Sequence, residues 1–308
     1  MLDTRRLRVL YEVARRGSFS AAAESLGYTQ PAISRQVALL ERETGTTLLE
    51  RRPDGARLTD AGELLVRHAE TLLARLQDAE EELGELLGMQ SGRLRMSTLS
   101  SAASTIAPPA ILEFRKRLPG VELSVSMLDP AGVLGALRAG EIDLAVTNDE
   151  SHFDLPEIEA VHLFDEPLLM ALPGDHPLAR RATVRLSDLA QERWMLGTTE
   201  SCPDASRFLQ ACAGAGFDPQ IAFHNDDYTA ILGFVAAGVG VAPVPEMVAR
   251  TAPRNATIRP LRSEALTRPI LASCPAGYRP GPVRTMVEIL MDVGEHWVTK
   301  RPAALAAA

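Results

Sequence analysis

Polar side chains suited to reading a DNA major groove gather near the N-terminus of this sequence. They are Thr29, Gln30, Pro31, Ser34, Arg35 and Gln36. Arginine and glutamine can make paired hydrogen bonds to a base edge, serine can hold a phosphate, and a proline ring can contact a thymine methyl. Arg51, Arg52 and Arg57 follow around an Asp-Gly pair that favours a β-hairpin. A basic hairpin can bind phosphates or enter the minor groove, so we expect both segments to contact DNA.

Local signals predict the helices that would hold these side chains. Apolar residues three and four positions apart predict a first helix ending at Gly17, and Ser18 can cap a second that ends at Gly27. Thr29 can cap a third helix, which runs to about Glu43. Two short helices joined by a glycine turn match a helix-turn-helix, in which the start of the second helix enters the major groove. A helical subdomain whose arginines are only solvated is the alternative that the spacing leaves open.

The charge of the chain divides unevenly between its parts. The 308 residues carry a net charge of −8, but residues 1–60 carry +2 and the remaining residues carry −10. A phosphate-binding surface is a local property, so a modestly basic head on an acidic body is compatible with DNA binding. Ordinary charge scatter would give the same totals, and the charge alone does not separate the two interpretations.

The N-terminal segment resembles the winged helix-turn-helix of LysR-type transcriptional regulators. The matching runs are Ser18-Phe19-Ser20-x-Ala22-Ala23-x-x-Leu26, Thr29-Gln30-Pro31-Ala32-Ile33-Ser34-Arg35-Gln36-Val37-x-x-Leu40-Glu41, and Leu58-Thr59-x-Ala61-Gly62. The resemblance implies that Gln30, Pro31, Ser34, Arg35 and the wing arginines face DNA. The sequence departs from the family at Leu49, where phenylalanine is usual, and at Ala38, where many members carry a basic residue.

A long helix is predicted from Thr59 to about Gly88. Its apolar residues alternate at spacings of four and three: Leu65, Ala69, Leu72, Leu76, Ala79, Leu83 and Leu86. This heptad stripe must pack either on the rest of its own chain or on another chain. The resemblance implies a linker helix that pairs subunits, so we expect a homodimer or homotetramer that presents paired heads to double-stranded DNA.

The remainder of the chain predicts a two-lobed α/β body. Short apolar runs read as strands, for example Val121–Leu128 and Ile142–Thr147, and helices fit between them, which predicts a mostly parallel sheet with covered faces. The expected helices include Ser104–Leu118, and Val239–Pro243 is an expected strand of the second lobe. The stretch Ala236–Pro245 extends the family resemblance into this region.

The predicted fold is α+β and multi-domain, with a periplasmic-binding-protein-like C-terminal region. We expect a winged helix-turn-helix at residues 1–58, a linker and dimerisation helix with a hinge at 59–90, and an effector-binding domain at 91–308. The effector-binding domain is expected to consist of lobe I, residues 91–163 and 268–308, and lobe II, residues 164–267.

Polar residues at the ends of the predicted strands suggest where a ligand binds. In open α/β sheets ligands bind at the carboxyl ends of the strands, and two lobes form a cleft there. The expected effector-binding residues are Ser100, Ser101, Thr147, Thr198, Ser201 and Asn225. This set is rich in hydroxyls and amides and poor in fixed charge, which suits a small polar or mildly anionic effector. The alternative is that each residue only caps a helix or a turn.

These features predict a cytoplasmic DNA-binding regulator that senses a small molecule and controls promoter activity, with RNA polymerase as a further candidate partner. The sequence contains no G-x-S-x-G elbow, P-loop, H-E-x-x-H or G-x-G-x-x-G motif, and its six histidines have no metal-ligand spacing. We therefore expect no enzyme activity, no metal and no cofactor. No stretch approaches the ~20 apolar residues of a membrane span.

Two alternatives remain. Cys202 and Cys212 are ten positions apart, and the resemblance extends to the peroxide-sensing branch of the family, which uses two nearby cysteines. A helix between them would have to melt before a disulfide could form, and acidic neighbours do not favour a thiolate at Cys202. The second alternative, a solute-binding protein built on the same two lobes, would have no use for the N-terminal head.

Overall fold

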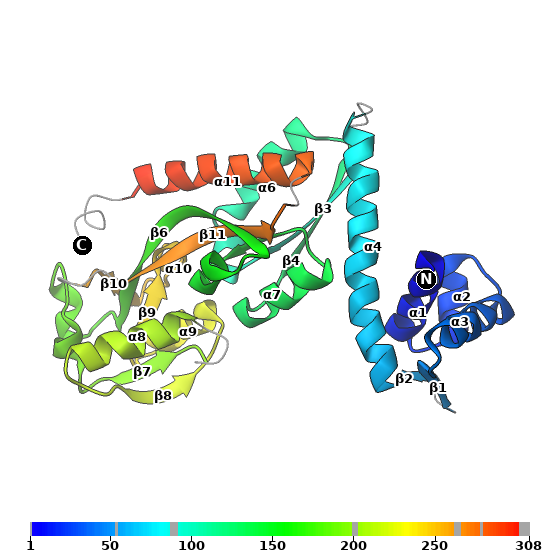
Figure 1. The fold of residues 1–308 in the computed structure, drawn as a ribbon. Coiled ribbons are helices and arrows are strands. Elements are labelled where there is room, and N and C mark those ends of the chain that lie inside the picture. Colours follow the sequence, from blue (N-terminus) through cyan, green and yellow to red (C-terminus); the bar gives the residue numbers. More distant parts are fainter. Residues whose placement is uncertain are drawn as a thin grey trace. The chain divides into compact units, whose positions relative to one another are not determined.

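The computed structural model describes residues 2–52, 55–86, 92–198, 203–261, 266–277 and 280–301. The chain forms two compact units, one of Met1–Leu87 with Arg138–Glu141 and the other of Gly88–Leu137 with Ile142–Ala308. Figure 1 shows the helices and strands of each unit.

The first unit contains three short helices, a hairpin and one long helix. They are α1 (Thr4–Arg16), α2 (Phe19–Leu26), α3 (Gln30–Thr44), β1 (Leu49–Arg52), β2 (Gly55–Leu58) and α4 (Asp60–Leu86). Gly17, Gly27 and Gly45 end the three short helices in the left-handed conformation, which glycine adopts without strain. The side chain of Ser18 accepts a hydrogen bond from the amide of Ala21 and so caps α2. The predicted winged helix-turn-helix is confirmed.

One predicted cap is wrong. Thr29 stands at the N-cap position of α3, but its side chain makes no capping hydrogen bond. The hairpin is tied to α3 by another contact, because the Glu41 carboxylate accepts hydrogen bonds from the amides of Leu48 and Leu49 at 2.9 and 3.3 Å. Leu7, Leu10, Ile33, Leu40 and Leu48 form the core beneath these elements.

The long helix α4 buries only part of its apolar stripe within its own chain. Near its N-terminal end Val66 and Ala69 are buried in the core of the first unit, where α4 packs on α1. Further along, Leu72, Leu76 and Leu83 remain 48%, 46% and 59% exposed. The predicted helix is confirmed, and its stripe is left uncovered over most of its length.

The second unit begins with strands and helices of a first lobe. Its elements are β3 (Gly92–Thr98), α5 (Ser100–Ala103), α6 (Ala107–Arg117), β4 (Val121–Met127), α7 (Pro130–Ala139) and β5 (Leu144–Thr147), and α11 (Gly281–Thr299) returns to it. We call this set lobe I. The helix expected over Ser104–Leu118 is wrong at its start, because Pro108 and Pro109 begin a separate helix, α6, after the short α5.

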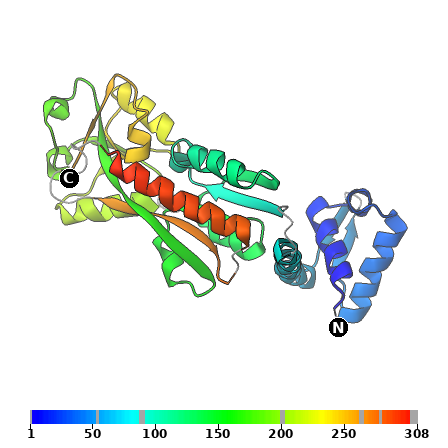
Figure 2. The ribbon, with the colours of Figure 1, turned by 90° about the horizontal axis from the view of Figure 1, so that it is seen from above.

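A second lobe follows, joined to the first by two long strands. We call lobe II the set β7 (Arg193–Leu196), α8 (Pro203–Gly214), β8 (Gln220–His224), α9 (Tyr228–Ala236), β9 (Ala242–Pro245) and β10 (Ala256–Arg259). The joining strands are β6 (Ile158–Pro173) and β11 (Thr267–Pro275), which run side by side (Figure 1). Figure 2 shows α11 lying along them, and α11 packs on α6 and β6. The remaining helix, α10 (Glu246–Ala249), follows β9 directly.

The expectation of a mostly parallel sheet is wrong. Strand β3 pairs in parallel with β4 and β5, and β7 with β8, but β11 is antiparallel to β5 and β6. The first half of β6 pairs with β11 and its second half pairs antiparallel with β9 and β10. The sheet is mixed because the two connections between the lobes are themselves strands of it. The predicted strand at Val239–Pro243 lies a little later, as β9.

Candidate functional site

The polar start of α3 forms an exposed surface in the first unit. Ile33, Val37 and Leu40 are buried on one face of the helix, whereas Pro31 and Arg35, four residues apart, are exposed on the opposite face. Thr29 and Gln30 are exposed as well, and Ser34 is half-buried. Four of the six expected residues of this segment are therefore exposed. Gln36, like Ser34, is half-buried.

The expected wing is the hairpin of β1 and β2. Arg51 pairs with Ala56 and Arg52 with Gly55 across the two strands. The backbone register places both arginines at the hairpin, while their side chains lie outside what the structure describes. Arg57 on β2 is exposed. The hairpin thus presents basic residues within the same unit as α3.

A cavity of about 470 Å³ lies in the second unit at the ends of five strands. Its described lining comes from the residues that follow β3, β4, β5, β7 and β8, together with residues of α8, α9 and β11: Leu99, Ser100, Ser101, Met127, Leu128, Asp129, Pro130, Asn148, Gly197, Pro203, Asp204, Asn225, Asp226, Asp227, Tyr228 and Arg268. We call this cavity the interlobe cleft. Its position at the carboxyl ends of strands is the predicted one, and its volume suits a small molecule.

The expected cleft residues divide into three groups. Ser100, Ser101 and Asn225 line the cleft. Thr147 is buried beside it, where its hydroxyl accepts a hydrogen bond from the amide of Asp149, and Thr198 bonds to Asp226; neither is among the described lining residues. Ser201 lies outside the described residues. The bond from the Asp149 amide to the Thr147 hydroxyl is the contact expected if Thr147 only caps a turn.

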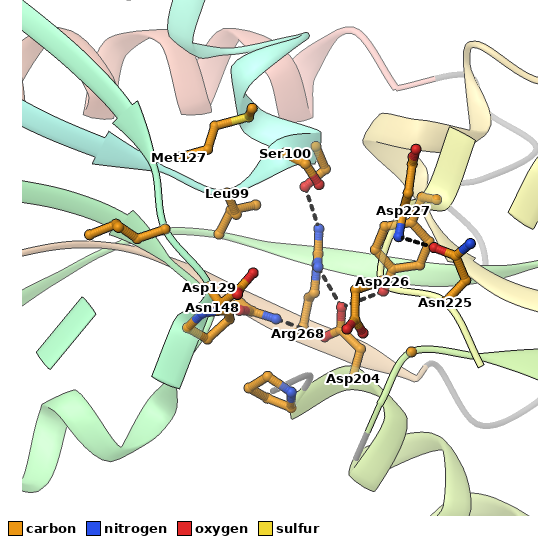
Figure 3. Close-up of a pocket in the computed structure, with 16 residues that line it drawn as sticks. Leu99, Ser100, Met127, Asp129, Asn148, Asp204, Asn225, Asp226, Asp227 and Arg268 are labelled. Atoms are coloured by element: carbon orange, nitrogen blue, oxygen red, sulfur yellow. Dashed lines mark hydrogen bonds and ion pairs between the residues drawn. The ribbon is translucent and has the colours of Figure 1, made fainter. Parts of the chain in front are cut away.

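Arg268 of β11 lies at the centre of the cleft (Figure 3). Its Nε and Nη2 atoms donate to Glu166 Oε2 at 2.9 and 2.7 Å, its Nη2 also donates to Ser101 Oγ at 2.8 Å, and its Nη1 donates to Asp204. The three charged residues are nearly inaccessible, with exposed fractions of 2% for Arg268, 0% for Glu166 and 4% for Asp204. We call Arg268, Glu166 and Asp204 the buried charge cluster.

Neighbouring side chains hold the cluster from both lobes. The Asn148 side-chain amide, which follows β5 of lobe I, donates to Asp204 Oδ1 at 2.8 Å. The Tyr228 hydroxyl, from α9 of lobe II, donates to Asp204 Oδ2 at 2.9 Å. The amide of Met247, in the first turn of α10, donates to Glu166 Oε1. The cluster therefore connects both lobes with the two strands that join them.

Burial and ion pairing have opposite effects on the pKa values of Glu166 and Arg268. Burial raises the pKa of the Glu166 carboxyl above its ordinary value, against the attraction of Arg268. Burial lowers the pKa of Arg268, but the carboxylates of Asp204 and Glu166 outweigh it and raise that pKa above its ordinary value. Arg268 thus stays charged, and burial favours the protonated form of Glu166.

The expectation of a lining poor in fixed charge is wrong for the described residues. Asp129, Asp204, Asp226, Asp227 and Arg268 all line the cleft. Sequence reasoning missed them because the carboxylates lie in turns after strands or at helix starts, where acidic residues are common. Arg268 could have been found, since a charged residue at the start of an apolar strand must be paired when the strand is buried.

The cysteine alternative gains no support from the described residues. Cys212 is a buried free thiol on α8, and burial, with Asp218 nearby, raises its pKa to about 12. A reactive thiol needs a lowered pKa. Cys202 lies outside the described residues, so its distance from Cys212 is undefined. In the described part of the chain no group of side chains has the arrangement of a metal site, and no helix is long and apolar enough to cross a bilayer.

Comparisons with known proteins agree with this architecture. Residues 4–63 match the bacterial regulatory helix-turn-helix proteins of the lysR family, and residues 88–295 match the LysR substrate binding domain. The transcriptional dual regulator GltC of Bacillus subtilis is 33% identical over 270 residues, which cover 87% of this chain and 89% of GltC.

Two further proteins match nearly the whole chain. The hydrogen peroxide-inducible genes activator of Pectobacterium carotovorum subsp. carotovorum is 30% identical over 309 residues, covering 96% of this chain and 97% of the relative. The crystal structure of full-length CbnR with its target DNA superposes with a TM-score of 0.69 at 24% identity, covering 95% of this chain and 100% of CbnR. The chain therefore belongs to the LysR family of DNA-binding transcriptional regulators, with an N-terminal helix-turn-helix and a C-terminal substrate-binding domain.

Proposed function

We propose that α3 reads the operator of this regulator through Gln30, Pro31, Ser34 and Arg35. The observation that carries this assignment is that Pro31 and Arg35 occupy the exposed face of the helix whose opposite face is packed in the core. Thr29 and Gln36 then flank the contact at its two sides, and Arg51, Arg52 and Arg57 of the hairpin bind phosphates or the minor groove. CbnR, which shares the fold, has been crystallised with its target DNA.

Replacing Arg35 by alanine tests the reading helix. We expect specific binding to a target site, measured by gel retardation, to weaken by about 1–3 kcal/mol for each half-site, because one bidentate base contact is lost. Binding to random DNA should change much less. Arg181→Ala is the matched control, since it removes the same charge from an exposed position of the second unit. Equal specific retardation of the Arg35 variant and the control would show that α3 reads DNA through other residues.

The interlobe cleft is the proposed effector site. It joins apolar side chains with a few convergent polar groups, which is the usual composition of a small-molecule site, and it lies within the region that matches the LysR substrate binding domain. A small polar effector would contact Ser100, Ser101 and Asn225, with Thr198 in an adjoining loop and Thr147 beneath. Ser201, outside the described residues, stays a predicted contact. The effector changes promoter activity only if its affinity differs between two arrangements of the protein.

Paired heads follow from the exposed stripe of α4. Leu72, Leu76 and Leu83 follow one another at spacings of four and seven residues and remain largely exposed, and a second copy of the helix would cover them in a coiled coil. We place this contact in a homodimer or homotetramer. The working division is a head at residues 1–58, a linker at 59–90, and lobes at 91–163 with 268–308 and at 164–267.

We further propose a location, a partner and a non-catalytic role for this regulator. A regulator that binds promoters acts in the cytoplasm beside the chromosome, and RNA polymerase is a natural further partner. The cleft lacks a paired nucleophile and base among its described residues, which favours a binding role over catalysis. The family consists of transcriptional regulators, and the proposed activity requires no cofactor.

A further inference from the structure

The interlobe cleft carries an excess of negative charge. Four of its described lining residues are aspartates, at positions 129, 204, 226 and 227, whereas Arg268 is the single cationic residue among them. Glu166 lies directly behind Arg268 and adds a fifth carboxylate. A cleft lined by one sign of charge concentrates ligands of the opposite sign.

Arg268 already forms hydrogen bonds with other side chains of the protein. It makes four hydrogen bonds, two to Glu166, one to Asp204 and one to Ser101. A guanidinium has five N–H donors, so little of its hydrogen-bonding capacity is left for a ligand. An anionic ligand would have to displace a buried carboxylate from Arg268 and would meet the aspartates of the rim.

The buried charge cluster is itself short of one positive charge. Arg268 faces two carboxylates, Glu166 and Asp204, and all three residues are almost completely buried. An unbalanced charge in such surroundings is costly unless a proton or a cation neutralises it. Burial is the main cause of the raised pKa of Glu166, and repulsion by the Asp204 carboxylate adds to it. Asp204 also lines the cleft.

The rim of the cleft carries carboxylates from both lobes. Asp129 follows β4 of lobe I, and its side chain has no hydrogen-bond or ion-pair partner among the described residues. Asp226 follows β8 of lobe II, and its carboxylate is oriented by the amide and hydroxyl of Thr198, both at 2.8 Å. Figure 3 shows Asp129 and Asp226 on opposite sides of Arg268. A group that pairs with both carboxylates would link the lobes.

We propose that the effector of this regulator carries a positively charged nitrogen, as an ammonium or guanidinium group, which binds between Asp129 and Asp226 in reach of Asp204. Leu99, Met127 and Leu128 provide an apolar surface for the hydrocarbon part of the same molecule. The inference rests on the proposed function, because it assumes that the effector occupies the interlobe cleft. It replaces the expected polar or anionic effector with a cationic one.

Probes that share a carbon skeleton and differ in charge test the inference. Butylammonium and butylguanidinium are cationic, 1-butanol is neutral and butyrate is anionic, and each is titrated into the full-length protein with binding followed by ligand-observed NMR. Both cations should bind about tenfold more tightly than butanol, which corresponds to one charge-assisted hydrogen bond, and butyrate should bind most weakly. Asp129→Asn should remove most of the advantage of the cations and leave butanol unchanged.

Three results would overturn the inference. The first is butyrate binding as tightly as the cations, and the second is cation binding that Asp129→Asn and Asp226→Asn leave intact. The third is failure to detect either cation at concentrations where butanol binds. Asp129 is exposed, so we expect its variant to fold, and an unchanged unfolding midpoint checks that the variant is intact.

A cleft-filling variant separates failure of this inference from failure of the proposed effector site. Ser100 is exposed and lines the cleft, so Ser100→Trp occupies the space without removing a contact of Arg268. If the variant abolishes butyrate binding while the cations never bind, the cleft is the site and its ligand is an anion. If the variant leaves every probe unaffected, the probes bind elsewhere and the effector site itself is misplaced.

Discussion

Replacing Arg268 by methionine should destabilise the second unit by about 3–5 kcal/mol, the usual cost of removing one partner from a buried ion pair. Methionine keeps the length and much of the volume of the side chain, so the change is mainly electrostatic. Glu166 and Asp204 would be left buried without a cation, and Ser101 would lose its hydrogen-bond donor. The effect is large because all three charged side chains are excluded from water.

The loss of stability caused by Arg268→Met should be larger at high pH than at low pH. Burial already raises the pKa of Glu166 in the wild-type protein, and removal of Arg268 raises it further. Between the ordinary carboxyl value and this raised value the folded state holds more protons than the unfolded state, so stability falls as pH rises through that window. The variant should therefore lose more stability at about pH 8 than at about pH 5.

Urea unfolding of the full-length protein measures this loss directly. The two tryptophans of the chain, Trp194 and Trp297, both belong to the second unit, so their fluorescence reports on that unit. The control is Arg181→Met, because Arg181 is 59% exposed and pairs with Asp188 at 3.0 Å; its removal should cost at most about 1 kcal/mol. Adding Glu166→Gln to the Arg268 variant should recover part of the loss. A cost near that of the control, or one that is equal at both pH values, would refute the reasoning.

Three further predictions concern other parts of the chain. Leu72→Ser combined with Leu76→Ser should shift the protein towards monomer in sedimentation equilibrium, because both side chains are exposed on the α4 stripe; an unchanged oligomer would place the subunit contact elsewhere. Gly62→Ala should destabilise the head by about 1–3 kcal/mol, since the added methyl would collide with the backbone carbonyl of Leu48, and an unaltered melting temperature of the head would contradict the packing. Cys212 should resist alkylation at about pH 8 until the protein unfolds, because burial raises its pKa to about 12; peptide mapping that finds rapid modification of the native protein would restore the redox interpretation.

The head could be predicted from sequence because its signals are local. Gly17 and Gly27 end helices through a backbone conformation that glycine adopts freely, and Ser18 caps α2 through a bond to a residue three positions away. The alternation of strand and helix patterns likewise predicted most helices and strands of the two-lobed C-terminal part. The antiparallel pairing in the sheet could not be predicted in this way. It depends on β6 and β11, which join the two lobes and pair although they lie about a hundred residues apart in sequence.

The cleft could be placed but its charge could not be predicted. Ser100, Ser101 and Asn225 were identified because polar residues after strands point to a binding edge. The decisive charges come from Asp204 and Arg268, which meet across 64 positions of sequence. Thr147 shows that a polar residue at a strand end need not line the cleft, since its hydroxyl instead accepts a hydrogen bond from the amide of Asp149.

The buried charge cluster links the lining of the interlobe cleft to the strands that join the lobes. Arg268 lies on β11 and Glu166 on β6, and they bind each other, while Asp204 and Ser101 reach them from lobe II and lobe I. An effector that paired with Asp204, as proposed above, would compete with Arg268 for that carboxylate and would alter the bonds between the two lobes. Because a ligand can shift a conformational equilibrium only through contacts that differ between the two states, contacts that cross the lobe boundary are the ones able to carry the signal. Asp204, a residue of the proposed ligand site, is thus also bonded to Arg268 on one of the strands that join the lobes.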